Sequence, residues 1–376
     1  MKDFGIMIRY PPYVWFEGEI LDRPMGFPRM GNMQLTYFLE DKVLQVGPAV
    51  SESIPEKLCP ALTNWILPRH QYRKGELLYQ FHSLLKNIRQ SGFPFQWYVP
   101  SILDYGSYRA DDLSFPYWVQ ERVSGIAFNS YLDRTDAENG VFSVLYGLIS
   151  FLGSLHSLSF PHALFGIYAE LSDCSLRTHY KKRLSCYQDV LEKIKKHYPE
   201  FSGVFRQLRS FINRKSEIID DLITQDETVV YVHNDFRGDN IIIEAGILNI
   251  IDLEQGLYGG DWLCDLYKIG LLPVVPIMHR ELLSESEKRR LIEVYLLLRQ
   301  HTGERIFTGF LEENRQRLIQ RIDLLKLDFM VSALILRHIM GWNFHIHALE
   351  RQEFRGAKFI LHLINQELLR TIRGQA

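Results

Sequence analysis

The clearest alternation of apolar and polar positions lies between residues 229 and 266. The β-branched run Val229–Val232 leads into a polar loop, and a second apolar run follows at Ile241–Ile243. The chain then turns at Gly246 and returns as the apolar run Leu248–Leu253. Apolar runs of this length, bounded by turn residues, are typical of buried strands. The pattern therefore predicts short buried strands whose connecting loops carry carboxylates.

Strand patterns also occur in the first third of the chain. Residues Met30–Val46 contain two strand-like runs around the polar turn 40–42. A helix is expected over Arg73–Arg89, and further strands are expected over Val99–Leu103 and Tyr117–Val123. This part of the chain is predicted to be mainly β.

Helical patterns dominate the remainder. From Gly140 to Ala169 the chain carries no formal charge, and part of this stretch is nearly long enough to span a bilayer. Gly, Ser and His residues interrupt it, so we expect a buried helix over residues 141–158 instead. Apolar residues recur at three- and four-residue spacing over residues 170–225 and again over residues 284–373, which predicts helices packed by one face.

Composition narrows the class of protein. The chain has 376 residues, of which 46% are hydrophobic, so it can bury a sizeable core as one large or two modest domains. Its formal net charge of −2 gives no reason to expect a nucleic-acid or anionic-membrane partner. The N-terminus lacks an apolar segment of signal-peptide length, so a cytoplasmic location is expected.

The four cysteines are scattered along the chain, with no C-x-x-C pair and no His at zinc-ligand spacing. They predict neither a disulfide framework nor a zinc site, and are interpreted as reduced thiols.

Candidate chemistry is concentrated in the loops of the first pattern. His233, Asp235, Asn240 and Asp252 are the residue types that metal-assisted phosphoryl transfer requires in one place. A base must stand near the attacking hydroxyl, and a carboxylate and an amide oxygen must hold Mg²⁺ on the phosphates.

The arrangement His-x-Asp-x-x-x-x-Asn, followed by an Asp at the end of an apolar strand, is that of kinase catalytic loops. Asn234 replaces the Arg of protein kinases, and Asp252-Leu253-Glu254 replaces their Asp-Phe-Gly. The segments HNDFRGDN, IIDLE and GGDWLCDL resemble the aminoglycoside phosphotransferase and choline kinase superfamily of small-molecule kinases. The chain departs from that pattern at Trp262, where Pro is usual.

The resemblance implies an α+β, two-lobed protein-kinase-like fold. Residues 1–122 would form a small, mainly β nucleotide-binding lobe, and residues 123–376 a larger, mainly α lobe for catalysis and acceptor binding. It implies ATP or GTP with Mg²⁺ as cofactors, and a small-molecule hydroxyl acceptor as partner. An antibiotic, an amino alcohol, a sugar or a biosynthetic intermediate would each fit.

The resemblance also assigns roles. Asp235 is expected to act as the base, with Asn240 and Asp252 as Mg²⁺ ligands and His233 as a brace of the loop. Arg237 would either meet the γ-phosphate or cap a neighbouring group. Asp261 and Asp265 are expected to fix loop and helix geometry.

Nucleotide contacts are expected in the first lobe. Gly31 lies in the hairpin that resembles the loop over the phosphates. In the hinge, the carbonyl of Glu121 and the amide of Val123 are candidates for recognising the base.

The position of the phosphate-gripping cation is ambiguous. If the third strand is Lys42–Val46, the position is Gln45, which has no charge. If the strand is Asn64–Arg69, Arg69 takes the position and Glu76 is its pairing carboxylate, which is the register we favour. An Arg69–Glu76 pair could equally be an ordinary surface ion pair.

Two alternatives follow from these departures. The degraded phosphate loop is compatible with a catalytically silent nucleotide-binding scaffold of the same fold, although retention of Asp235, Asn240 and Asp252 argues against it. A protein kinase is less favoured because no activation segment follows Asp252.

Overall fold

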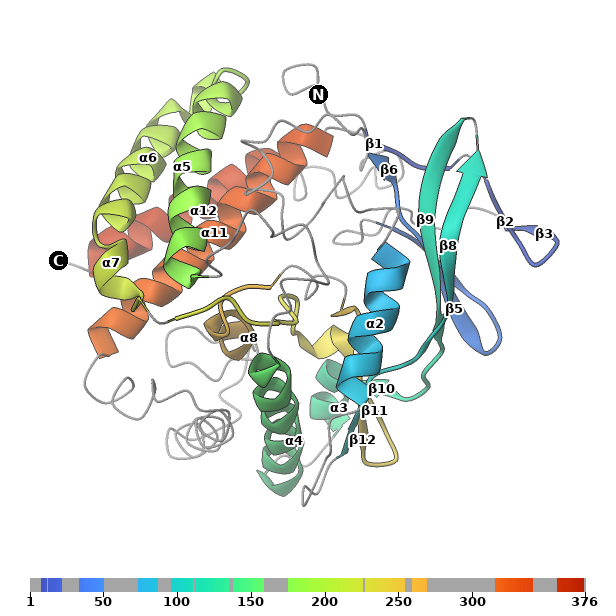
Figure 1. The fold of residues 1–376 in the computed structure, drawn as a ribbon. Coiled ribbons are helices and arrows are strands. Elements are labelled where there is room, and N and C mark those ends of the chain that lie inside the picture. The colour runs from blue at the N-terminus through green and yellow to red at the C-terminus, as the bar shows by residue number, and fades with distance from the viewer. Residues whose placement is uncertain are drawn as a thin grey trace.

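The computed structural model describes residues 8–11, 13–21, 34–50, 74–86, 96–110, 112–134, 138–158, 175–225, 227–253, 259–268, 315–340 and 357–374. Strands gather in the first part of the chain and helices in the second (Figure 1). The mixed α+β architecture predicted from the sequence is confirmed.

The strands of the described part are β1 (Ile8–Arg9), β2 (Val14–Phe16), β3 (Glu19–Leu21), β4 (Leu35–Phe38), β5 (Lys42–Val46), β6 (Ala49–Val50), β7 (Gln96–Tyr98), β8 (Ile102–Ala110), β9 (Leu113–Glu121), β10 (Ile126–Ala127), β11 (Ile241–Glu244) and β12 (Ile247–Ile250). The helices are α2 (Lys74–Lys86), α3 (Phe128–Arg134), α4 (Glu138–Ser157), α5 (Leu176–Lys195), α6 (Ser202–Glu217), α7 (Ile219–Leu222), α8 (Leu263–Lys268), α11 (Arg315–Met340) and α12 (Ala357–Gly374), with short 3-10 turns η4 (Pro199–Phe201) and η5 (Gly238–Asn240).

The N-terminal sheet is antiparallel, in the order β4-β5-β9-β8. Strands β4 and β5 form a hairpin in which Leu35 lies opposite Val46, which confirms the predicted hairpin. Strand β5 then pairs with β9, with Gln45 opposite Trp118. Strand β9 is therefore enclosed between β5 and β8.

Strands β8 and β9 are longer than the sequence pattern predicted. Strand β8 continues beyond residue 103 to Ala110, and β9 begins at Leu113 rather than Tyr117. Strand β8 is the edge of the sheet, and exposed side chains such as Asp104 and Arg109 alternate along it. An edge strand carries more polar residues than a central one, and these residues hid the strand pattern.

The two faces of this sheet bury different clusters. Leu44 and Val119 lie in one apolar cluster, which Val14 of β2 also joins. On the other face, Trp118 belongs to the larger core together with Phe81 of α2. Successive residues of a strand point to opposite faces, so the neighbours Trp118 and Val119 serve different cores.

A second sheet has the order β10-β11-β12-β7. Strands β11 and β12 form the predicted hairpin, which turns at Ala245 and Gly246 with positive φ angles of 47° and 81°. Strand β7 comes from the first part of the chain and pairs in parallel with β12. The two parts of the chain thus share this sheet, and a lobe boundary at residues 122 and 123 stays a prediction.

The apolar run 229–232 is not a strand, contrary to the prediction. Val230 makes only an isolated bridge with Gly260. Tyr231 and Val232 are fully buried in the main core. A β-branched run fits a buried extended segment as well as a paired strand, and here burial explains the composition.

The first part of the uncharged stretch lies in helix α4, which confirms the predicted buried helix. Fully buried side chains run along it: Val144, Leu148, Ile149, Phe151, Leu152 and Leu155. Among the described helices, none combines the length and the apolar character of a membrane span.

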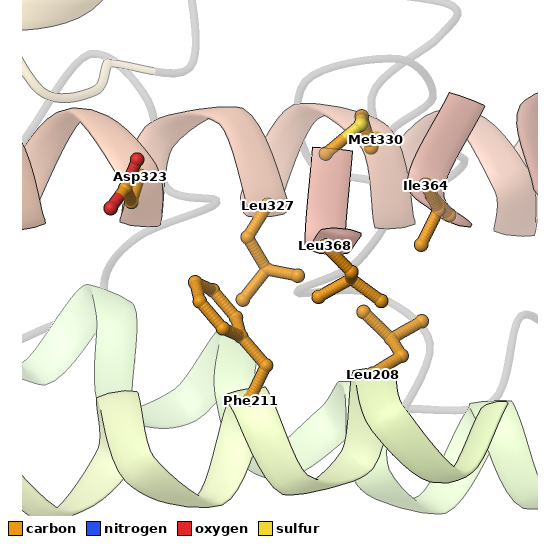
Figure 2. Close-up of a pocket in the computed structure, with 7 residues that line it drawn as sticks. All are labelled: Leu208, Phe211, Asp323, Leu327, Met330, Ile364 and Leu368. Carbon is orange, nitrogen blue, oxygen red and sulfur yellow. The ribbon is translucent and has the colours of Figure 1, made fainter. Parts of the chain in front are cut away.

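Helices α5, α6, α11 and α12 lie together on the side of the molecule away from the N-terminal sheet (Figure 1). Figure 2 shows apolar side chains of α6, α11 and α12 meeting in a seam, namely Leu208, Phe211, Leu327, Met330, Ile364 and Leu368. These helices fall within the regions predicted to be helical, while residues 284–314 lie outside the described part. Apart from Asp323 the seam is apolar, so it serves packing rather than phosphoryl chemistry.

Arg321 of α11 joins the helical part to the segment that contains the predicted catalytic loop. Its guanidinium is fully buried and donates two hydrogen bonds to the carboxylate of Asp261, from Nε to Oδ2 at 2.9 Å and from Nη2 to Oδ1 at 2.8 Å. Its Nη1 donates to Glu227, which precedes the catalytic loop. The planar fork of Arg suits two carboxylates in this way, and Lys could not reproduce the contact.

We expect Arg321→Met to reduce the free energy of unfolding by about 3–5 kcal/mol, because it leaves Asp261 and Glu227 buried without their cation. Equilibrium urea unfolding measures the change. Arg209→Met is the matched control, since Arg209 pairs with Glu192 at the surface and its loss should be within error. A loss below about 1 kcal/mol for Arg321→Met would contradict the anchoring role.

Candidate active site

The catalytic segment, which contains the predicted catalytic residues, lies between the helical bundle and the second sheet. Residues 227–253, in yellow in Figure 1, run from the helical bundle towards the second sheet. The bridge between Val230 and Gly260 fixes the segment before the loop, and the β11–β12 hairpin fixes it after the loop. The polar loop of residues 233–240 is thus held at both ends.

Asp265 of α8 fixes the conformation of this loop. Its Oδ2 accepts the backbone N–H of His233 at 2.6 Å, and its Oδ1 accepts that of Asn234 at 2.8 Å. His156 of α4 donates from Nε2 to Oδ2 at 3.1 Å, and both side chains are fully buried. Asn234 has a φ of 62°, a left-handed conformation that a non-glycine residue rarely adopts unless its surroundings enforce it.

The charge of Asp265 survives its burial. Burial by itself would raise the pKa of the carboxyl group, but hydrogen bonds from His156 and from the His233 backbone outweigh it, and the pKa is lowered. The group is therefore ionised at neutral pH and can accept from both loop amides.

His233 is buried beneath the loop. Burial lowers the pKa of its imidazole, against the opposing charges of Asp265 and Asp235, so the ring is neutral at pH 7. Its Nε2–H donates to the carbonyl of Ile251 at 2.9 Å, because a carbonyl can only accept. The ring also packs against Phe236, with centroids 5.2 Å apart. His233 thus joins the loop to the residue beside Asp252.

Asp235 and Asn240 are brought together by the loop. The Nδ2 of Asn240 donates to the carbonyl of Asp235 at 2.9 Å and to its carboxylate Oδ2 at 3.1 Å. The Asp235 side chain keeps 26% of its surface exposed, so an incoming group can reach it. The Nε of Arg237 lies 3.3 Å from the same oxygen in a half-exposed pair.

Asn129 of α3 shapes the loop, a contact that no sequence pattern predicted. Its Nδ2 donates to Asp239 at 2.9 Å. A Cβ at Gly238 would lie 2.0 Å from its Oδ1, so a larger residue at that position would displace the Asn129 side chain. The short η5 turn then returns the chain to Asn240.

Asp252 follows the hairpin in a left-handed conformation, with a φ of 60°. The neighbouring Ile251 N–H donates to the carbonyl of Asn240 at 3.0 Å, which places the two predicted metal ligands on adjacent, hydrogen-bonded segments. A carboxylate and an amide oxygen are hard donors that suit Mg²⁺, which takes few protein ligands when it also binds phosphates. Within the described residues no cluster of three or more His, Cys, Asp or Glu side chains could form an all-protein metal cage.

The hinge is tightly braced. The carboxylate of Glu121 accepts hydrogen bonds from the Tyr98 hydroxyl at 2.5 Å and from the Ser101 N–H at 3.1 Å. Burial opposes its ionisation, but these hydrogen bonds prevail and lower its pKa. Gly125 has a φ of 122°, and a Cβ there would lie 2.4 Å from the carbonyl of Ile243. The Glu121 side chain thus stabilises the hinge. The main-chain carbonyl of Glu121 and the amide of Val123 stay the candidates for base recognition.

The remaining predicted residues lie around the N-terminal sheet. Gly31 and Arg69 fall outside the described residues, so their assignments stay predictions. Glu76 lies in the first turn of α2, where its Oε1 accepts from Gln80 at 3.4 Å. Gln45 is buried in β5, and its Oε1 accepts from the Trp118 indole N–H at 2.5 Å.

Comparisons with known proteins relate the chain to one sequence family and to several solved structures. The sequence pattern of the phosphotransferase enzyme family, APH, matches residues 31–295. No curated protein matches the sequence. Solved structures with a similar fold include the gentamicin complex of APH(2")-IIa, which is 16% identical with a TM-score of 0.48, over 90% of this chain and 88% of that one.

Choline kinase from Cryptosporidium parvum Iowa II is 13% identical with a TM-score of 0.46, over 98% of this chain and 91% of that one. Spectinomycin phosphotransferase APH(9)-Ia, in complex with ADP and spectinomycin, is 10% identical with a TM-score of 0.44, over 96% and 95%. The family pattern spans well over half of the 376 residues. The chain therefore belongs to the phosphotransferase enzyme family, whose members are normally small-molecule kinases.

Proposed function

We propose that the protein transfers the γ-phosphoryl group of ATP or GTP to a hydroxyl group of a small molecule. The observation that carries this proposal is the Asp235 carboxylate, which is partly exposed and hydrogen-bonded at 3.1 Å to Asn240. A reachable, oriented carboxylate beside an amide ligand is what the catalytic loop of a kinase must provide. A scaffold without activity has no need to orient it.

Asp235 would orient the acceptor hydroxyl and accept its proton. The acceptor oxygen forms a bond to the γ-phosphorus, the bond from that phosphorus to the bridging oxygen breaks, and the nucleoside diphosphate leaves. In a loose transition state little proton transfer is needed early, so positioning of the hydroxyl contributes most. Arg237 lies beside Asp235, where it can either face the γ-phosphate or balance the charge of the carboxylate.

Asn240 and Asp252 would hold Mg²⁺. Their oxygens suit this ion, and the hydrogen bond from Ile251 N–H to the Asn240 carbonyl supports their proximity. When bound, Mg²⁺ neutralises the charge of the phosphate oxygens. Asn240 also donates to Asp235, so the same side chain relates the position of the base to that of the ion.

A hollow of about 30 Å³, too small for the acceptor itself, shows which charged groups lie beside the loop. Residues of α5, α8, α11 and the catalytic segment line it: His179, Tyr180, Asn234, Gly260, Asp261, Cys264, Leu325, Asp328, Phe329 and Ser332. Its carboxylates Asp261 and Asp328 are paired with Arg321 and Arg183. Burial lowers the pKa of His179 to about 4, so this imidazole is neutral. Balanced charge favours a neutral or weakly charged hydroxyl compound over a polycation.

The first test is a thermal-shift titration with ATP, GTP and ADP, each with and without Mg²⁺. A nucleotide at about 100 times its Kd should stabilise the wild-type protein by about 2.7 kcal/mol, and only when Mg²⁺ is present. Asp252→Ala should lose this shift. Unchanged nucleotide affinity of Asp252→Ala in Mg²⁺ would exclude its role as a ligand, and no shift of the wild type with any nucleotide would favour a silent relative.

Asp235→Ala should reduce phosphoryl transfer by at least about 100-fold, because the general base is lost. Nucleotide affinity should stay within about threefold, since Asp235 is not among the proposed nucleotide contacts. Release of ADP over a panel of hydroxyl acceptors measures the rate. Asp221→Ala, which removes an exposed carboxylate of α7, is the control and should keep activity within about tenfold. If Asp235→Ala also stays within tenfold, about 1.4 kcal/mol of barrier, the assigned base is wrong.

Asp265→Asn should lower kcat by about 100-fold while leaving nucleotide affinity nearly unchanged. An amide in this place must turn an N–H towards one of the loop N–H groups, so the loop loses an acceptor and Asp235 shifts. Single-turnover rates and nucleotide titrations separate the two effects. The surface substitution Asp221→Asn controls for loss of charge. A wild-type kcat, or a fall in kcat fully matched by weaker binding, would refute the positioning role.

A further inference from the structure

Strand β5 carries no cation at the position where the family resemblance predicts a phosphate-binding one. Strand β9 is flanked by β5 on one side and β8 on the other, so β5 is the strand that pairs with the hinge strand. This favours the register in which Gln45 occupies the position of the phosphate-binding cation. The amide of Gln45 is buried and accepts a hydrogen bond from Trp118.

A lysine from another element reaches the same face. Lys74, the first residue of α2, is buried at 7% exposure. Its Nζ lies 4.6 Å from the centroid of the Trp118 ring and 3.4 Å from Oε1 of Gln34. Trp118 therefore contacts both the uncharged Gln45 and the ammonium group of Lys74.

Gly75 makes this approach possible. A Cβ at this position would lie 2.5 Å from the Cβ of Tyr105 and 2.9 Å from the carbonyl oxygen of Tyr117. Any larger residue would push the first turn of α2 away from β8 and β9. The glycine lets the helix lie against the sheet, and so brings Lys74 onto the face that carries Gln45.

Gln34 links the ammonium group to the segment that leads into β4. It directly precedes β4, in the hairpin that resembles the phosphate-covering loop of the family. Its side chain is buried, with 3% of its surface exposed. Two amide side chains, an indole and an ammonium group thus meet on one face, and the ammonium group is the strong ligand for an anion among them.

We propose that Lys74 of helix α2 supplies the cation that binds the α- and β-phosphates of the nucleotide, in place of the uncharged Gln45 of strand β5. This inference rests on the proposed nucleotide-dependent function. The ammonium group would exchange its contact with Gln34 for phosphate oxygens, while Trp118 continues to support it through cation–π attraction.

The test compares the affinities of Mg·ATP and adenosine by isothermal titration calorimetry. The variants are Lys74→Gln, which keeps a hydrogen-bonding group but removes the charge, and Arg69→Gln, the alternative cation. Lys215→Gln is the matched control, because Lys215 is also buried, with its Nζ 5.2 Å from the Phe211 ring centroid, but lies on α6.

Lys74→Gln should weaken Mg·ATP binding by about 10- to 100-fold, as expected for one hydrogen bond to a charged phosphate. Adenosine binding should change by less than about threefold in this variant, because adenosine has no phosphate. Arg69→Gln and Lys215→Gln should bind Mg·ATP like the wild type. Wild-type affinity of Lys74→Gln, or a loss confined to Arg69→Gln, would overturn the assignment to Lys74.

If Lys74→Gln does not fold, the wild-type protein carries the test by itself. Mg·ADP should slow acylation of the Lys74 amine, measured by mass spectrometry, by at least about tenfold and leave the exposed Lys195 unaffected. Equal acylation rates with and without bound Mg·ADP would refute the inference. A wild type that binds no nucleotide would overturn the proposed function itself, and the two failures are thus distinguishable.

Discussion

The Asp265 carboxylate is the constraint on which the site depends. It accepts the backbone N–H groups of His233 and Asn234 together with the His156 imidazole, all in the buried core. Each hydrogen bond to a charged group contributes about 1.5–3 kcal/mol, which offsets the desolvation of the carboxylate and the strain of the left-handed Asn234. These hydrogen bonds therefore keep Asn234 in an unfavourable backbone conformation, and so hold the following residue, Asp235, in place.

The same short stretch also anchors the helical part of the molecule. Asp261, which precedes α8, receives the forked hydrogen bonds of Arg321, and its Oδ1 accepts the Leu263 N–H at the start of that helix. Residues 261–265 thus join two interactions, one that stabilises the packing of α11 and one that orients the catalytic loop. The two interactions lie four residues apart along the chain.

The N-terminal sheet brings an uncharged amide and a lysine from a helix onto one face. The amide oxygen of Gln45 in β5 accepts a hydrogen bond from the Trp118 indole. Lys74 comes from a different element, made accessible to the sheet by Gly75. On our proposal the positive charge keeps its place near the phosphates although its position in the sequence has moved.

Features made by residues that are close together along the chain could be predicted from the sequence. The spacing of His233, Asp235 and Asn240 lies within one loop, the hairpin turn needs only Ala245 and Gly246, and the buried helix α4 follows from an uncharged run. Local pattern suffices there because the interactions concerned are short in sequence.

Contacts between residues far apart along the chain, and the pairing of apolar runs, became visible only in the folded structure. The apolar run 229–232 proved to be buried with one isolated bridge instead of a strand, because burial and strand pairing select the same residue types. The contact of Arg321 with Asp261 crosses 60 positions, and that of Lys74 with Gln34 crosses 40. Neither contact has a local sequence pattern. A charged residue in a helix is usually predicted to be solvent-exposed, and its distant partner becomes known only when the packing is known.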